Sequence, residues 1–352
     1  MRLKDIYQPI SKELDDVEDL LRVSLANTGY KSISEVNNYL LEAKGKRLRP
    51  ALVIFSAKAA KETHQLNKHS MASLACAVEL IHIASLIHDD VMDHAALRHH
   101  KPTINSRYGE DVSITLGDYL YSKAFELIAN CKDIDILSCV SQATRLMCEG
   151  QLIQVCERDN LELLKSRYII VVKKKTAALF AASCRAGAIL ADARDPYKNT
   201  LGEYGLNFGV AFQIIDDCLD LIAKVEDLGK DPGADLKMGE LTLPVLNLLS
   251  KAKDKNRILS LISAKDNGET FRELRERFIN SEAALATKKD ILFYIRKAKK
   301  SLSGLEESCF KQSMCALADF MVERLKLSVS IPPSAGLRRM SLDGHDIGLP
   351  KR

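Results

Sequence analysis

The chain has 352 residues, of which 51 are basic and 47 acidic, so its formal net charge is only +4. This near balance argues against a nucleic-acid binding protein, which would need a concentrated basic face. The length permits two domains, but no Pro- or Gly-rich linker divides the helical patterns, and we predict one all-α domain.

Targeting signals are not apparent at the N-terminus, where the run MRLKDIYQPISKELDD carries early acids and no apolar segment. No uncharged apolar stretch of about 18 residues is recognised either, so no transmembrane segment is predicted. Nine cysteines are spread singly without a C-x-x-C pair, and we interpret them as buried thiols of a reducing compartment. The expected location is cytoplasmic.

Helical periodicity first appears over residues 4–26 and again over residues 33–42. The run GKRLRP follows, and Pro50 suits the first turn of a further helix. Lys46 and Arg49 are therefore predicted near a helix N-terminus, where anions bind. A solvated basic loop is the alternative.

A long, almost wholly apolar helix is predicted over residues 71–88, with Glu79 and His82 as its main polar interruptions. It ends in three aspartates that share one helix face, Asp89, Asp90 and Asp93. These anions oppose one another and the helix dipole, so a cation is expected beside them. Oxygen ligands suit Mg²⁺, although a solvated acidic helix end is the alternative.

A polar loop is predicted over residues 94–111, and helices over residues 113–129 and 134–157 should form the far wall of a cavity. The three histidines of the loop could suggest zinc, but no cysteine lies nearby. The run YIIVV at residues 168–172 continues in helical register through residues 173–190, so helix is favoured over strand.

A second cluster of three aspartates with the same spacing follows the apolar run FGVAFQII. It consists of Asp216, Asp217 and Asp220. Two such helices facing each other across a cavity could hold two or three Mg²⁺ ions and clamp a diphosphate. The ions would stabilise the charge that develops as a diphosphate leaves.

The C-terminal third begins with a Gly/Asp/Lys loop over residues 224–243 and continues as amphipathic helices to about residue 326. We predict a helical domain over residues 1–327. Residues 328–352 contain a Pro-Pro pair and several Ser and Gly residues, which predicts a disordered tail.

Both aspartate motifs, their spacing and GKRLRP resemble the trans-isoprenyl diphosphate synthases over about residues 3–326, and most of all the medium- and long-chain polyprenyl members. The resemblance implies a helical bundle of the isoprenoid synthase type around a central cavity. It also implies a prenyltransferase that extends an allylic diphosphate with isopentenyl diphosphate, acting as a homodimer.

The resemblance further implies two sets of diphosphate contacts. The set for isopentenyl diphosphate is Lys46, Arg49, His82 and His99. The set for the allylic diphosphate is Arg98, Lys175, Thr176, Gln213 and Lys230. His99 stands where the family has an arginine, and Glu240 where many short-chain members have a second lysine. Because histidine is only partly charged near neutral pH, affinity for isopentenyl diphosphate is expected to be reduced or pH-dependent.

The expected reaction begins with cleavage of the allylic C–O bond, since Mg²⁺ and cations such as Arg98, Lys175 and Lys230 neutralise the departing charge. Lys175 thus joins the six aspartates as a predicted catalytic residue. The double bond of isopentenyl diphosphate then attacks the carbocation, and a proton is lost. The family implies that released diphosphate is the base.

Product length is expected to depend on Ser85 and Ala84, which lie about one turn before Asp89. Both are small, whereas short-chain relatives commonly have an aromatic ring there. We predict an open apolar tunnel and a product of roughly 25 carbons or more, with Phe125 or its neighbours as the floor.

Two other functions stay open. A class I terpene cyclase would share the ionisation step but would not bind isopentenyl diphosphate, and Lys46, Arg49 and His82 argue against it. A non-catalytic or regulatory synthase subunit would explain His99 and Glu240, but not six intact aspartates. An apolar product also leaves open a peripheral membrane contact at product release.

Overall fold

The computed structural model describes residues 1–26, 29–42, 45–60, 66–98, 100–222, 233–264, 268–279 and 281–328. Helices dominate these residues, which confirms the predicted all-α class. The strands β1 (Leu97–Arg98) and β2 (Lys101–Pro102) form a two-residue antiparallel hairpin in the described part of the chain. The predicted tail lies outside the described residues from residue 329 onward, so its boundary stays a prediction.

The N-terminal elements cover one end of the molecule. They are α1 (Leu3–Tyr7), the 3-10 turn η1 (Gln8–Ile10), α2 (Ser11–Ala26) and α3 (Lys31–Leu41). The single helix predicted over residues 4–26 is interrupted at η1, because Pro9 has no backbone N–H to donate to a helical hydrogen bond. The helix predicted over residues 33–42 is confirmed as α3.

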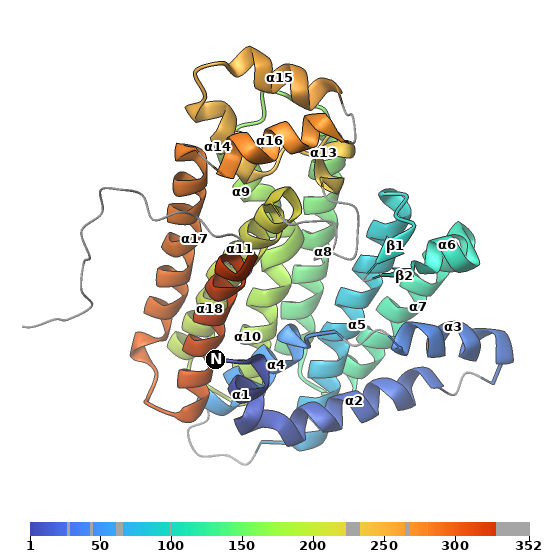
Figure 1. Ribbon diagram of the computed structural model, residues 1–352. Coiled ribbons are helices and arrows are strands. Elements are labelled where there is room, and N and C mark those ends of the chain that lie inside the picture. The colour runs from blue at the N-terminus through green and yellow to red at the C-terminus, as the bar shows by residue number, and fades with distance from the viewer. Residues whose placement is uncertain are drawn as a thin grey trace, which may run out of the picture.

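The central helices build the core and carry the predicted chemistry. They are α4 (Leu48–Ala59), α5 (Lys68–Met92), α7 (Glu110–Ala129), α8 (Ile134–Cys156), α10 (Ala178–Leu190) and α11 (Asp195–Ile222). α5 packs against α7, while α10 packs against α4, α8 and α11. Figure 1 shows α8, α10 and α11 running alongside one another in the middle of the molecule. The predicted long helices are thus confirmed, with α11 extending far beyond the apolar run that suggested it.

The helix α5 corrects one expectation. By length and composition alone it could cross a membrane, although the sequence was expected to contain no such stretch. In its most apolar window 72% of the residues are buried inside the structure. Side chains such as Ala77, Val78 and Leu80 are 0% exposed, because other helices of the core surround this part of α5. The apolar run is therefore accounted for by packing inside the protein.

The remaining elements connect and pack around this core. They are α6 (Ile104–Tyr108), α9 (Lys165–Val172), the π-helical turn η2 (Lys173–Ala177), α13 (Ala234–Lys237), α14 (Leu243–Lys251), α15 (Lys255–Ala264), α16 (Glu269–Ile279), α17 (Glu282–Ser301), η3 (Leu302–Gly304) and α18 (Cys309–Ser328). The loop predicted over residues 94–111 is partly wrong, since it contains the β-hairpin and α6. Thr103 caps α6 by accepting a hydrogen bond from the Ser106 N–H at 3.0 Å.

The cysteines differ from the prediction of buried thiols. Only Cys76, Cys184 and Cys218 are buried, whereas Cys148 and Cys156 are exposed on α8. The difference arises because α8 buries one face only, and apolar sequence composition does not say which residues face outward.

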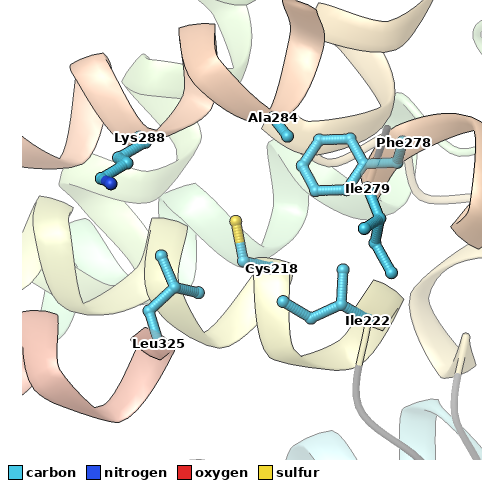
Figure 2. Close-up of a pocket in the computed structure, with 7 residues that line it drawn as sticks. All are labelled: Cys218, Ile222, Phe278, Ile279, Ala284, Lys288 and Leu325. Atoms are coloured by element: carbon cyan, nitrogen blue, oxygen red, sulfur yellow. The ribbon is translucent and has the colours of Figure 1, made fainter. Parts of the chain in front are cut away.

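A small apolar cavity lies between α11, α16, α17 and α18, and Cys218 and Ile222 line it from α11 (Figure 2). Phe278 and Leu325 close it from the other helices. None of the predicted site residues lines this cavity.

Candidate active site

The first aspartate cluster lies at the C-terminal end of α5, where each carboxylate faces a cation from a different element. Lys175 Nζ lies 3.8 Å from Asp89 Oδ1. Arg98 donates hydrogen bonds of 2.7 and 2.9 Å to Asp90 Oδ1. Asp93 lies just beyond the helix and accepts a 2.9 Å hydrogen bond from Arg158 Nη2. Side chains of η2, β1 and the turn after α8 therefore offset the negative charge of this cluster.

Burial and charge compete at this end of α5. Burial raises the pKa of Asp89, and the positive charge of Lys175 opposes that rise. Burial lowers the pKa of Arg98, but its hydrogen bonds to Asp90 and the charges of Asp89 and Asp216 raise it above its ordinary value. Arg98 therefore lies within electrostatic reach of both aspartate clusters.

The second cluster lies at the C-terminal end of α11, with Asp217 and Asp220 buried and Asp216 exposed. Asp217 accepts hydrogen bonds from the Tyr168 hydroxyl and, at 2.7 Å, from Gln213 Nε2. Burial raises the pKa of Asp217 to about 7, although both hydrogen bonds oppose the rise. This carboxyl therefore sits in a largely desolvated environment.

The π-helical turn η2 connects the two clusters. Lys175 faces Asp89, while the adjacent Thr176 donates a 2.7 Å hydrogen bond to Gln213 Oε1, and Gln213 in turn donates to Asp217. Short π-helical segments occur frequently at functional sites. The structure thus brings both acidic motifs to opposite sides of the Lys-Thr pair.

Two glycines allow this close approach. A Cβ on Gly150 of α8 would lie 2.8 Å from Lys175 Cα, and a Cβ on Gly209 of α11 would lie 2.7 Å from Ala177 Cα. Real Cβ atoms essentially never come that close, so any larger residue would push η2 away. Both positions therefore fix where Lys175 and Thr176 sit.

The chemistry of the donors fits Mg²⁺, which is held by oxygen ligands, usually one or two carboxylates together with waters and substrate phosphates. Throughout the described ranges, no three His, Cys, Asp or Glu side chains converge closely enough to hold a metal ion by themselves. The predicted metal ligands therefore stay a prediction.

Two of the predicted site residues cannot be placed. His94 and His100 are exposed, and His99 and Lys230 lie outside the described residues. The predicted roles of His99 and Lys230 therefore stay predictions.

The predicted front cations lie at the N-terminus of α4. Arg49 is 6% exposed, and its guanidinium carbon lies 4.2 Å from the centre of the Phe180 ring. Its Nε atom has no hydrogen-bond partner within the described part of the chain. Burial lowers the pKa of Arg49 to about 10, which still leaves it charged at neutral pH. Lys46 is exposed, and its carbonyl accepts a 3.0 Å hydrogen bond from Tyr7.

His82 lies on α5 between these front cations and the first aspartates. Burial lowers its pKa well below the ordinary value, and the charges of Arg49, Arg98 and Arg47 act in the same direction. The imidazole is therefore neutral near pH 7 and can offer a hydrogen bond but no positive charge.

Sequence reasoning missed several residues of this site. Tyr168 precedes Lys175 by seven residues, and that two-turn spacing on a helical run could have indicated a shared face. Arg158 was also missed, because only the tertiary structure brings it beside Asp93 and Glu240. Arg47, in the middle of GKRLRP, contacts Glu18 and Glu79 instead of facing the site.

The predicted chain-length residues differ in exposure. Ala84 is fully buried, whereas Ser85 is half-buried and its hydroxyl donates a 2.7 Å hydrogen bond to the His82 carbonyl. On α7, burial raises the pKa of Tyr121, and the charge of Asp89 adds to that rise, so this ring lies near the first cluster. Phe125, one turn further along α7, packs against the core. The tunnel itself stays a prediction.

The sequence matches the polyprenyl synthetase family over residues 30–277. It is 34% identical to a short chain isoprenyl diphosphate synthase of Methanothermobacter thermautotrophicus, covering 92% of this chain and 99% of that protein. It is 33% identical to heptaprenyl diphosphate synthase component 2 of Bacillus subtilis, covering 92% and 91%. The structure resembles a polyprenyl synthase of Caulobacter crescentus, solved with calcium and isoprenyl diphosphate, with a TM-score of 0.86, 33% identity and coverage of 92% and 98%.

Proposed function

Because the chain belongs to the polyprenyl synthetase family and is a prenyltransferase, we propose that it joins isopentenyl diphosphate head to tail to an allylic diphosphate, in the trans configuration. The observation that carries this proposal is the linkage of two aspartate clusters through Lys175, Thr176 and Gln213. Such an arrangement can bind a diphosphate from two sides.

The allylic diphosphate is proposed to lie between the two clusters. When bound, Mg²⁺ would neutralise the charge of the departing diphosphate. The proposed metal ligands are Asp89, Asp90, Asp93, Asp216, Asp217 and Asp220. Lys175, Thr176 and Gln213 orient the diphosphate, and Arg98 adds a charge shared between the clusters. Water is kept away from the reacting carbons by the buried faces of α5 and α11.

Isopentenyl diphosphate is proposed to bind at the front of α4 through Lys46, Arg49 and His82. The buried guanidinium of Arg49 supports this role, since Phe180 holds it in place and its Nε has a hydrogen-bonding capacity left to use. The two proposed diphosphate sites would then hold both substrates in fixed orientations, which brings their reacting carbons together.

Product length is proposed to be medium or long. The relatives differ in this property by name, since one is a short chain synthase and another a heptaprenyl synthase component. Support comes from the small side chains of Ala84 and Ser85 one turn before Asp89. Large rings at those positions would shorten the space available to the growing chain.

The chain is further proposed to act as a homodimer in the cytoplasm. Support for self-association comes from large apolar side chains that are exposed on α7 and α8, including Ile114 at 47% and Leu152 at 66%. Burial of such side chains against a second copy would remove apolar surface from water.

The test is incubation of the purified protein with Mg²⁺, farnesyl diphosphate and labelled isopentenyl diphosphate, followed by chromatography of the products. We expect labelled polyprenyl diphosphates, and we expect Asp89→Asn to abolish them. Release of diphosphate without label incorporation would indicate a terpene cyclase instead. Inactivity that is relieved only by a second synthase subunit would indicate a regulatory role.

A further inference from the structure

Arg158 and Glu240 lie together against the first aspartate cluster. Arg158 follows the end of α8, and Glu240 follows α13. Arg158 donates 3.3 Å hydrogen bonds from Nε and Nη2 to Glu240 Oε1, and its Nη2 also donates to Asp93 Oδ1 at 2.9 Å. Gln154 donates to the other oxygen of Glu240. One guanidinium thus serves two carboxylates, one of which belongs to the first cluster.

The backbone ties the same two turns together. The Asp159 N–H donates a 2.8 Å hydrogen bond to the Gly239 carbonyl. Gly239 has a φ of +77°, and a Cβ there would lie 2.8 Å from Asp159 Cγ, so glycine is required for the contact. The turn that carries Glu240 is therefore fixed against the turn that carries Arg158.

The same contacts extend to the second cluster. The Glu240 N–H donates to the Asp235 carbonyl at 2.9 Å, and the Asp235 N–H donates to Asp220 Oδ2 at 3.4 Å. A continuous path of polar contacts therefore runs from Asp220 through Glu240 and Arg158 to Asp93.

Arg158 offsets the repulsion between the two carboxylates that it contacts. The Glu240 side chain is 13% exposed and lies within electrostatic reach of Asp93, which it would repel. Arg158, 21% exposed, lies against both and offsets the repulsion. Because a guanidinium can donate to two carboxylates at once, the pair holds Asp93 in one orientation.

On the premise of the synthase function above, we propose that Arg158 and Glu240 are positioning residues that set the orientation of Asp93 and the net charge of its surroundings. Arg158 competes with a divalent cation for Asp93, and Glu240 limits that competition because it shares Arg158 with Asp93. The positive charge of Arg158 therefore weakens Mg²⁺ binding at the cluster and strengthens diphosphate binding.

The experiment compares Arg158→Met, Glu240→Gln and the double variant with wild type. Mg²⁺ affinity is measured by calorimetry without substrate, and the KM for farnesyl diphosphate is measured by label incorporation. Arg158→Met should tighten Mg²⁺ binding at least about threefold, because one positive charge leaves, and should raise the KM at least about fivefold. Glu240→Gln should weaken Mg²⁺ binding, and the double variant should return it close to wild type.

Arg167→Met is the matched control, since Arg167 pairs with Glu157 at 3.0 Å in the neighbouring turn and contacts no carboxylate of the cluster in the described chain. It should change neither quantity. Weaker Mg²⁺ binding together with a higher KM in Arg158→Met, or a double variant that behaves like Arg158→Met, would overturn the proposal.

A substitute variant and a binding measurement cover the cases of misfolding and inactivity. If Arg158→Met fails to fold, Arg158→Lys and Glu240→Gln carry it, with near wild-type Mg²⁺ affinity expected for the first and weaker affinity for the second. The calorimetry needs no turnover. A wild type that is inactive both alone and with a second synthase subunit would therefore refute the synthase function, while the order of Mg²⁺ affinities would still decide the role of the pair.

Discussion

Arg47 and Arg49 lie two residues apart, yet their charges serve different purposes. Arg47 has a φ of 51° and contacts Glu18 and Glu79, and its Nη1 lies 2.8 Å from Glu79 Oε1. Arg49 instead stacks on Phe180 at the N-terminus of α4. Because Glu79 is only 3% exposed, Arg47 is needed to keep a buried carboxylate paired. Of the two arginines, only Arg49 remains available for an anion.

Substitution of these arginines should separate binding from stability. Arg49→Lys loses the planar fork and the stacking on Phe180, so the KM for isopentenyl diphosphate should rise about tenfold while the KM for the allylic substrate changes little. Arg47→Met leaves Glu79 unpaired and should cost about 3 kcal/mol of unfolding free energy. Steady-state kinetics and urea unfolding measure the two effects. Equal kinetic defects in both variants would contradict the assignment.

The buried carboxyl of Asp217 predicts a pH dependence of stability. Burial raises its pKa from the ordinary 3.8 to about 7. The folded protein therefore holds a proton that the unfolded chain releases, so this contribution to stability is complete at low pH and is lost as pH rises through about 7.

Asp217→Asn removes this titration. In the presence of a chelator, we compare the Tm of the variant with that of wild type. The difference, variant minus wild type, should become several degrees more positive as pH rises from about 5 to about 8. Differential scanning fluorimetry measures it. A difference that is independent of pH would show that Asp217 does not titrate in this range.

At the scale of elements, the turn η2 places the chemistry. The helical register over residues 168–190 was predictable from periodicity, and α9, η2 and α10 confirm it by following one another without a break. The π-helical turn was not, because it depends on how closely α8 and α11 approach it. Gly150 and Gly209 are small for that tertiary reason, and the sequence alone gives no partner for them.

Gly150→Ala tests this arrangement. The new Cβ would lie 2.8 Å from Lys175 Cα and 2.9 Å from its Cβ, so η2 must shift. We expect a loss of about 1–3 kcal/mol in unfolding free energy from overpacking, with a higher KM for the allylic diphosphate.

Gly202→Ala on α11 is the control, because its nearest contact would be an ordinary 3.6 Å to Arg185 Cβ. It should stabilise the protein by up to about 1 kcal/mol. Urea unfolding compares the two variants. A stabilising Gly150→Ala would show that η2 tolerates displacement.

Two positions on α5, Ala84 and Ser85, indicate how product length can be changed. Ser85 is half-buried and Ala84 is 0% exposed, so an aromatic ring is better accommodated at Ser85. Ser85→Phe should shorten the products, whereas Ala84→Phe should both shorten them and cost about 1–3 kcal/mol of stability. Chromatography of the products measures the first effect. An unchanged product distribution in both variants would place the growing chain elsewhere.

Across the whole molecule, local patterns were predictable and tertiary pairings were not. The i, i+1, i+4 spacing placed Asp89, Asp90 and Asp93 on one helix end, since helix geometry alone determines that face. The partners of those carboxylates come from distant segments, as with Arg158. Their meeting depends on packing, which periodicity does not encode. Exposure was also unpredictable, so the cysteines of α8 were wrongly expected to be buried.

One exposed stripe on α8 leads to a prediction for the assembly of the whole molecule. Cys148, Leu152 and Val155 are exposed at i, i+4 and i+7, so they form one apolar stripe on that helix. Burying this stripe against a second copy would remove apolar surface from water. Leu152→Asp should therefore halve the mass measured by light scattering, whereas Val23→Asp on α2, where Val23 is 72% exposed, should not. A monomeric wild type at micromolar concentration would exclude a dimer built on this stripe.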